Sequence, residues 1–402
     1  MHRLTVVRQP TLAMILMLSL ILAALIGPAH AQDSTPSPTP DDSYPNAGLL
    51  VETDWLADHL DDPTVRVIDL RSTDAYAEGH IPGAVSVPVG DIASTIDEIA
   101  LEFDQDEVQA ALNRIGLMPD MTAVLYDDLG MMNSARLFWT LDYVGHADAR
   151  ILNGGWNAWA AAGLPASTDA PTIESTEYPI ELQPARLITA EEIVARLDDP
   201  DVVILDARSP QEYTGEVALA ARGGHIPGAR LFTWLDALTG GDTVYTVESG
   251  WEEQLRDEDV EVFKSAAELQ ALLDDLGLSP EHEIITYCHT HWRGAHLYFL
   301  LRLMGYENVR GYDGSWAEWG NRDDLPVVTG PEPGGAAGDT ALLDGEQLVQ
   351  MRCVGCHDLN RIDHQDKDRA GWENTVARMI AYGTPLTDEE RDAVIDYLAE
   401  TH

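Results

Sequence analysis

The chain has 402 residues, of which 45% are hydrophobic and 23% charged, a length typical of two or three globular domains. Its 69 acidic residues outnumber 24 lysines and arginines, so the formal net charge is -45 at pH 7. Such a negative surface repels nucleic acid and anionic lipid headgroups, which excludes both as expected partners. There are only three cysteines, so disulfide bonds are not expected to hold the fold together.

The N-terminal segment 1–31 has the pattern of an export signal. Two arginines precede the apolar run LAMILMLSLILAALIG, and the segment ends in Ala-His-Ala, the small-x-small pattern that signal peptidase cleaves. We expect the mature chain to begin at Gln32 and the protein to be periplasmic, with no membrane attachment beyond the signal peptide. The alternative is an uncleaved anchor, because the apolar run is nearly long enough to cross a bilayer.

Two segments, 32–46 and 329–340, are predicted to be linkers. They are rich in Pro, Gly, Ser, Thr and Asp and have no periodic apolar pattern. They divide the mature chain into a body, residues 47–328, and a tail, residues 341–402.

The body contains an internal repeat. VRVIDLRSTDAYAEGHIPGA at 65–84 returns as VVILDARSPQEYTGEVALAARGGHIPGA at 202–229, which predicts two copies of one domain over residues 47–170 and 185–328. Each copy alternates short β-branched runs, such as VRVIDL and EIITYC, with amphipathic segments such as DEVQAALNRIGL. This alternation predicts an α/β fold in which helices flank a parallel sheet.

Features that occur in both copies are expected to be scaffold. The GHIPGA turn, the paired tryptophans of GGWNAW and GSWAEW, and an Asp-x-Arg pair all recur. Arg208, the arginine of the second pair, has two possible roles: ion pairing with a carboxylate, or substrate binding.

Features found in one copy are candidates for chemistry. Copy one has Asp127 where copy two has Cys288, so copy one lacks a nucleophile and is expected to be structural. Cys288 is predicted to end a strand, with loop amides and a helix N-terminus favouring its thiolate form. His289, His291 and Arg293 are expected to add positive charge, making Cys288 a nucleophile for an anionic electrophile. The alternative is a buried, inert cysteine.

These residues resemble a known family. The tandem copies, the D-x-R…GHIPGA segment and the CHTHWR loop resemble two-domain rhodaneses, and C-x-T-H-x-R with EYTGE and GSWAEWGN resembles bacterial thiosulfate:cyanide sulfurtransferases. The resemblance implies that Cys288 takes the outer sulfur of thiosulfate, releases sulfite, and passes the sulfur from a persulfide to a thiophilic acceptor. It implies that Arg293 closes the loop and stabilises the thiolate and persulfide. Glu212 stands where some animal members have a substrate-binding arginine, a departure for which His289 and His291 could compensate.

The tail contains the c-type haem attachment pattern CVGCH: thioethers from Cys353 and Cys356 fix the porphyrin, and His357 ligates the iron. A thioredoxin-like motif is the alternative, but it needs a preceding strand, whereas DGEQLVQMR is predicted to be helical. The segment GWENTVARMIAYGTPLTDEERDAVIDYLAE resembles small monohaem cytochromes c, which makes Met379 the second axial ligand, with His364 as the alternative. We therefore expect one covalent haem c in a small all-α domain.

Together these patterns predict an exported tandem rhodanese fused to a cytochrome c. Its expected partners are thiosulfate, a thiophilic acceptor such as cyanide or a thiol, and a redox partner protein. Two alternatives remain open: a sulfur-carrier or redox-sensing module without turnover, and a haem-linked oxidoreductase of persulfide or thiosulfate.

Overall fold

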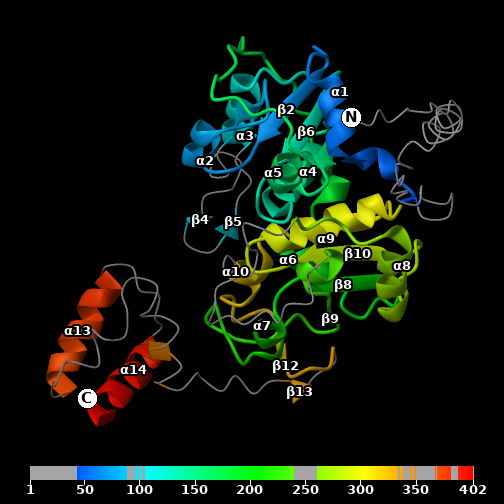
Figure 1. Ribbon diagram of the computed structural model, residues 1–402. Coiled ribbons are helices and arrows are strands. Elements are labelled where there is room, and N and C mark those ends of the chain that lie inside the picture. The colour runs from blue at the N-terminus through cyan, green and yellow to red at the C-terminus, as the bar shows by residue number, and fades with distance from the viewer. Residues whose placement is uncertain are drawn as a thin grey trace, which may run out of the picture. The chain divides into compact units, whose positions relative to one another are not determined.

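The computed structural model describes most of the two copies and part of the tail (Figure 1). The described residues are 43–87, 96–97, 100–101, 105–239, 260–333, 336–337, 345, 348–349, 367, 369–381 and 388–401. The predicted signal peptide and the CVGCH motif lie outside them. In these ranges no helix has both the length and the apolar character needed to span a bilayer.

Copy one is built on a parallel sheet with the strand order β1-β7-β6-β2-β3. Its strands are β1 (Leu50–Val51), β2 (Val65–Asp69), β3 (Val85–Ser86), β6 (Thr122–Tyr126) and β7 (Ala149–Leu152). Its helices are η1 (Ala47–Leu49), α1 (Thr53–His59), α2 (Thr73–Glu78), α3 (Gln105–Arg114), α4 (Met132–Tyr143) and α5 (Gly155–Ala161). A separate antiparallel pair is formed by β4 (Ile96–Asp97) and β5 (Ala100–Leu101).

Copy two repeats this plan with the strand order β11-β10-β8-β9, again all parallel. Its strands are β8 (Val202–Asp206), β9 (Arg230–Leu231), β10 (Glu283–Tyr287) and β11 (Val309–Gly311). Its helices are η3 (Pro184–Arg186), α6 (Ala190–Val194), α7 (Pro210–Thr214), η4 (Trp234–Ala237), α8 (Ala266–Asp275), α9 (Trp292–Leu303) and α10 (Ser315–Trp319). A single parallel bridge between Leu187 and Gly311 takes the place of β1. The predicted α/β fold is confirmed for both copies.

The central strands are apolar because helices cover both faces of each sheet. In β6, β8 and β10, every residue after the first is buried. Tyr287, the last residue of β10, lies in register with Asp206, the last residue of β8. The residues that follow these two strands therefore meet at the carboxyl edge of the sheet, where ligand sites of open α/β folds lie.

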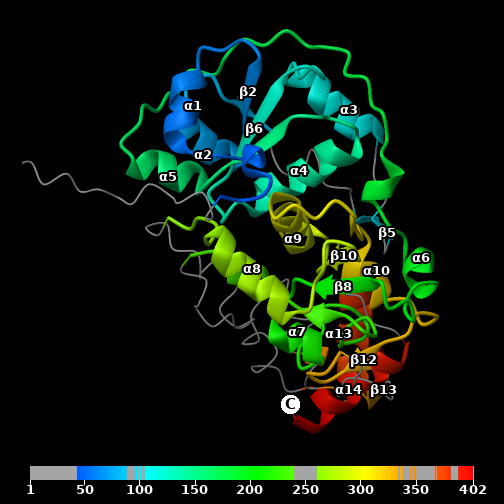
Figure 2. The same cartoon turned by 90° about the vertical axis from the view of Figure 1, so that its right-hand side faces the viewer.

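The two copies share one apolar core. Helices α4 and α9 pack against each other, as both Figure 1 and Figure 2 show. Phe138 and Phe299 meet edge to face with ring centroids 4.8 Å apart. Beside them, the hydroxyl of Tyr298 donates to Asp142 at 2.6 Å. Copy one is therefore packed as part of the same body as copy two.

The described elements of the tail are helices, with α13 at Arg369–Ala381 and α14 at Asp388–Thr401. They form their own apolar cluster: Leu348, Val349, Trp372, Val376, Val394, Ile395 and Leu398. Gly345 approaches α14 closely, since a Cβ at that position would lie 2.3 Å from both the Ala393 carbonyl oxygen and the Tyr397 Cβ.

The predicted linker 329–340 contains regular structure. Strand β12 (Val328–Thr329) pairs antiparallel with β13 (Ala336–Ala337). The two strands satisfy each other's backbone hydrogen-bonding groups. The segment has no periodic apolar pattern from which this pairing could have been predicted.

Candidate active site

Cys288 directly follows β10, and α9 begins at Trp292, so the predicted strand-loop-helix arrangement of CHTHWR is confirmed. The thiol is unbridged and its residue is only 1% exposed. The Cys288 amide donates to Ser315 Oγ at 3.3 Å, and its carbonyl accepts from the Trp316 amide at 2.9 Å. The next carbonyl, of His289, accepts from the Ala317 amide at 2.9 Å. The start of α10 therefore holds the root of the loop.

Arg293, the last residue of the CHTHWR motif and the second residue of α9, is anchored to Glu212 on α7. Its two terminal nitrogens donate to the two carboxylate oxygens at 2.6 and 3.0 Å. The side chains are 11% and 1% exposed, so the pair is mostly removed from water. Glu212 also caps α7, because one of its oxygens accepts from the amide and hydroxyl of Ser209, both at 3.0 Å. The loop end and the α7 cap thus share one carboxylate.

The pairing with Arg293 accounts for a glutamate at position 212, where some animal rhodaneses have a substrate-binding arginine. Burial alone would raise the pKa of Glu212, but the Arg293 and Arg208 guanidinium groups outweigh it and lower the pKa to about 2. The carboxylate is therefore ionised at neutral pH and offsets the charge of Arg293. We interpret the pair as a closure that holds the loop rather than as a binding site for an anion.

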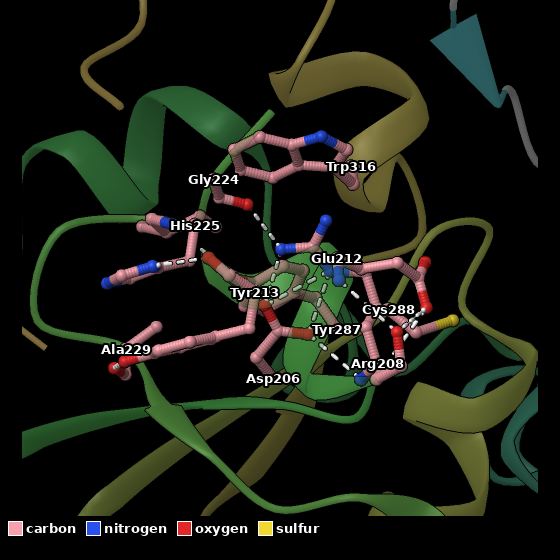
Figure 3. A network of polar contacts seen from close by, with 12 residues as sticks. Asp206, Arg208, Glu212, Tyr213, Gly224, His225, Ala229, Tyr287, Cys288 and Trp316 are labelled. Atoms are coloured by element: carbon pink, nitrogen blue, oxygen red, sulfur yellow. Dashed lines mark hydrogen bonds and ion pairs between the residues drawn. The ribbon is translucent and has the colours of Figure 1, made fainter. Parts of the chain in front are cut away.

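Arg208 lies in a fully buried network, part of which Figure 3 shows with Glu212 and Cys288. Its Nε and Nη2 donate to Asp206 at 2.9 and 2.6 Å, and Nη2 also donates to the Gly224 carbonyl at 2.6 Å. Its guanidinium lies 4.3 Å from the ring centroid of Trp316. Copy one repeats the pattern, with Arg71 paired to Asp69 and stacked on its own tryptophan at 4.1 Å. Copy one is silent, in the sense that it has Asp127 in place of the cysteine. Because this silent copy has the same network, the geometry favours ion pairing over substrate binding for Arg208.

The structure corrects the expected charge of His291. The residue is fully buried in a left-handed conformation, φ 61°, immediately before α9. Its ring meets that of Trp139 from copy one at 4.8 Å, and a Cβ on Gly311 would lie 2.3 Å from its Nε2. Burial, reinforced by the positive charge of Arg136, holds the pKa of His291 well below its ordinary value. His291 is therefore neutral at physiological pH, whereas its partly buried neighbour His289 remains a candidate polar group of the loop.

The loop that follows β6 in copy one, beginning at Asp127, is the counterpart of the Cys288 loop and shows which groups can be held there. One oxygen of Asp127 accepts from the amides of Leu129 and Met131 at 2.7 and 3.1 Å. The other accepts from both the amide and the hydroxyl of Ser134 at 2.6 Å. Amides of the loop and of the first helical turn thus hold a buried carboxyl group at the position equivalent to Cys288, while burial raises the pKa of Asp127. In copy two the loop is one residue shorter, but it enters its helix through the same left-handed conformation, at His291 before α9 as at Met131 before α4.

The sequence did not single out Ser315. It adopts a left-handed conformation, φ 49°, and donates its hydroxyl to the Tyr312 carbonyl at 2.8 Å while accepting the Cys288 amide. Copy one has Gly155 here, where a Cβ would lie 2.1 Å from the Asp127 carbonyl oxygen. The sequence signal that could have identified Ser315 is the difference between GGW in copy one and GSW in copy two.

The predicted haem residues fall almost entirely outside the described part of the chain. Cys353, Cys356, His357 and the alternative ligand His364 lie there, and Met379 lies within α13.

The comparisons define the class of the protein. The model of the rhodanese-like domain matches residues 52–162 and 189–322, so the chain belongs to the rhodanese-like family and carries the domain twice. The tail, residues 343–402, matches the haem-binding model of the alpha subunit of quinohemoprotein amine dehydrogenase A.

Each of the following relatives aligns with both copies. A thiosulfate sulfurtransferase of Azotobacter vinelandii is 34% identical over 287 residues, which is 71% of this chain and 99% of the relative. A sulfur carrier protein of Thermus thermophilus is 34% identical over 304 residues, 72% of this chain and 99% of the relative. Among solved structures, the anaerobic ergothioneine biosynthesis enzyme of Chlorobium limicola, in complex with trimethyl histidine, superposes with a TM-score of 0.61 at 29% identity over 72% of each chain.

Proposed function

We propose that this protein is an exported thiosulfate sulfurtransferase. The observation that carries the proposal is an unbridged cysteine at the carboxyl edge of a parallel sheet, in a loop whose counterpart in copy one donates amide hydrogen bonds to the Asp127 side chain. Relatives named thiosulfate sulfurtransferases that match both copies support it. Residues 1–31 would direct the chain to the periplasm.

The reaction requires two displacements at sulfur. The Cys288 thiolate attacks the outer sulfur of thiosulfate, the sulfur–sulfur bond breaks, and its electron pair leaves with sulfite. Cyanide or a thiolate then attacks the outer sulfur of the Cys288 persulfide, forming thiocyanate or a new persulfide and regenerating the thiolate. Negative charge resides at Cys288 or its persulfide before and after each displacement, so we expect loop amides, like those that hold Asp127 in copy one, to stabilise the reacting groups. The Arg293–Glu212 pair keeps the loop closed around them.

We further propose that the tail carries one covalent haem c. The donor set suits the group: thiols at Cys353 and Cys356 for two thioethers, the imidazole of His357, and the thioether of Met379. The close approach of Gly345 to α14 and the apolar cluster around Trp372 provide a compact helical scaffold. When bound, the haem supplies one-electron exchange with a redox partner protein in sulfur metabolism.

The test is steady-state turnover. Purified protein should form thiocyanate and sulfite from thiosulfate and cyanide, and Cys288→Ser should abolish this activity while leaving the circular dichroism spectrum and thermal unfolding unchanged. Retained turnover in Cys288→Ser would falsify the assignment of the nucleophile.

A second candidate function is that of a sulfur carrier without turnover. It is favoured by the equal identity to a sulfur carrier protein and by the low exposure of Cys288. Loading of one sulfur per chain, with no repeated release of sulfite when cyanide is added, would identify a carrier.

A further inference from the structure

A buried ion pair joins the two copies on the side of the interface that carries Cys288. Arg136 on α4 of copy one donates from Nη1 to Asp313 in copy two at 2.6 Å, across 177 residues of sequence. The two side chains are 2% and 4% exposed. Asp313 follows β11 and directly precedes the turn into α10.

The equivalent positions on the side of Asp127 carry no opposite charges. His296 on α9 takes the place of Arg136 and lies against the rings of Trp234 and Phe263 at 5.2 and 5.0 Å. Asn153 takes the place of Asp313 and accepts from the Phe263 amide at 3.2 Å. The ion pair therefore belongs to the copy with the nucleophile, not to the scaffold common to both.

Asp313 lies in the turn that positions Cys288. Two residues further on, the hydroxyl of Ser315 accepts from the Cys288 amide, and the Trp316 amide donates to the Cys288 carbonyl. Both peptide groups around the nucleophile are thus held by residues 315 and 316. A buried carboxylate at Asp313 requires a charged or hydrogen-bonding partner to keep one orientation.

Arg136 also contacts the loop itself. Its guanidinium lies 5.6 Å from the ring centroid of Trp292, the fifth residue of CHTHWR, and 4.8 Å from that of Trp139. One side chain from the silent copy therefore contacts both the start of α9 and the turn into α10, the two segments between which Cys288 is held.

We propose that Arg136 is a positioning residue through which the silent copy completes the active site of copy two. It acts through Asp313 and Trp292, and it fixes the orientation of the Cys288 peptide and hence of the sulfur. This inference rests on the proposed sulfurtransferase function, and it assigns copy one a role in the reaction beyond packing.

The test compares three variants of the full chain. Arg136→Met removes the charge at similar volume, and Arg136→Lys restores it. Tyr298→Phe is the matched control, because it removes the hydrogen bond to Asp142 between the same two helices and leaves the Arg136–Asp313 pair intact. The measurements are kcat and KM for thiosulfate, and the rate at which iodoacetamide alkylates Cys288.

We expect Arg136→Met to lower kcat about 10- to 100-fold, the scale of a misplaced reacting group, with little change in KM and with slower alkylation. Arg136→Lys should recover part of the loss, and Tyr298→Phe should keep both rates near the wild-type values. Wild-type kcat and alkylation in Arg136→Met would overturn the inference, as would an equal loss in Tyr298→Phe.

If Arg136→Met fails to fold, Asp313→Asn takes its place, because it removes the charge of the partner at nearly the same shape. Slow alkylation and low kcat in this variant support the proposal, and wild-type values overturn it. The alkylation rate does not depend on the sulfur donor. If the wild type fails to turn over thiosulfate while alkylation slows in the variants, the proposed function fails and the positioning role stands.

Discussion

The contribution of the Arg293–Glu212 pair to the free energy of unfolding can be calculated from the structure, and the variant Glu212→Gln tests it. One Glu212 oxygen accepts three hydrogen bonds, from Arg293 and from the amide and hydroxyl of Ser209, and the other accepts one from Arg293. The glutamine keeps a single oxygen and turns an NH₂ group toward one set of donors. The variant therefore loses the charge and at least one hydrogen bond while retaining the volume.

Two independent routes give the same magnitude. Removing one partner of a buried ion pair costs about 3 to 5 kcal/mol. The difference between the ordinary pKa of 4.5 and the value of about 2 in the folded protein corresponds to about 3 kcal/mol. We expect Glu212→Gln to lower the free energy of unfolding by about 3 kcal/mol at pH 7.

The sign of the pH dependence follows from the lowered pKa. The ionised carboxylate contributes its full stabilisation above pH 4.5, and the contribution is lost as the pH falls toward 2. The difference between wild type and variant should thus be constant from pH 7 to about pH 5.5 and shrink below the ordinary pKa. Urea unfolding followed by tryptophan fluorescence at a series of pH values measures it.

The chain provides a matched control in the capping box of α8. Glu268 accepts from the amide and hydroxyl of Ser265 at 3.0 and 2.6 Å, as Glu212 does from Ser209, but it is exposed. Glu268→Gln should therefore destabilise the protein much less than Glu212→Gln. Equal losses in the two variants would show that the cap accounts for the effect and that the ion-pair reasoning is wrong.

Three further predictions concern the silent loop, the buried histidines and the tail. Asp127→Ala should lower the melting temperature, because it leaves the buried donors of Leu129, Met131 and Ser134 without their acceptor, yet the specific activity of the folded fraction should stay at the wild-type value; a loss of activity at constant fold would contradict a structural role for copy one's loop. Burial lowers the pKa of His296 to about 3, so the folded protein keeps this ring neutral while the unfolded chain binds a proton below about pH 6.5. Stability should therefore fall as the pH drops from 6.5 toward 3, and His296→Leu should reduce that slope by about 1.4 kcal/mol per pH unit; an unchanged slope in urea unfolding would refute the assignment. Haem should remain bound to the chain on a denaturing gel stained for peroxidase activity and be lost when Cys353 and Cys356 are both replaced by alanine. A near-infrared methionine-sulfur band should be present and be lost in Met379→Ala, whereas a spectrum that lacks this band and does not change in Met379→Ala would instead point to His364 or an open position.

The sequence alone was sufficient for the α/β class, the two copies, and the strand-loop-helix placement of Cys288. These properties depend on local periodicity and on a repeat that can be compared with itself, and both are visible in the linear order of residues. The comparison of copies also identified the loop 288–293 as the place where chemistry differs. The haem motif at 353–357 was equally visible, since its spacing is short.

Only the tertiary structure paired Arg293 with Glu212, 81 residues away, and Arg136 with Asp313, 177 residues away. It also showed that His291 is neutral, because the ring of Trp139 from the other copy and the backbone at Gly311 bury it. Charge and burial depend on which segments meet in space, and no local pattern records that for residues so far apart in the chain. For this reason the sequence located the nucleophile, whereas the fold decided how its loop is held and which of the neighbouring side chains carry charge.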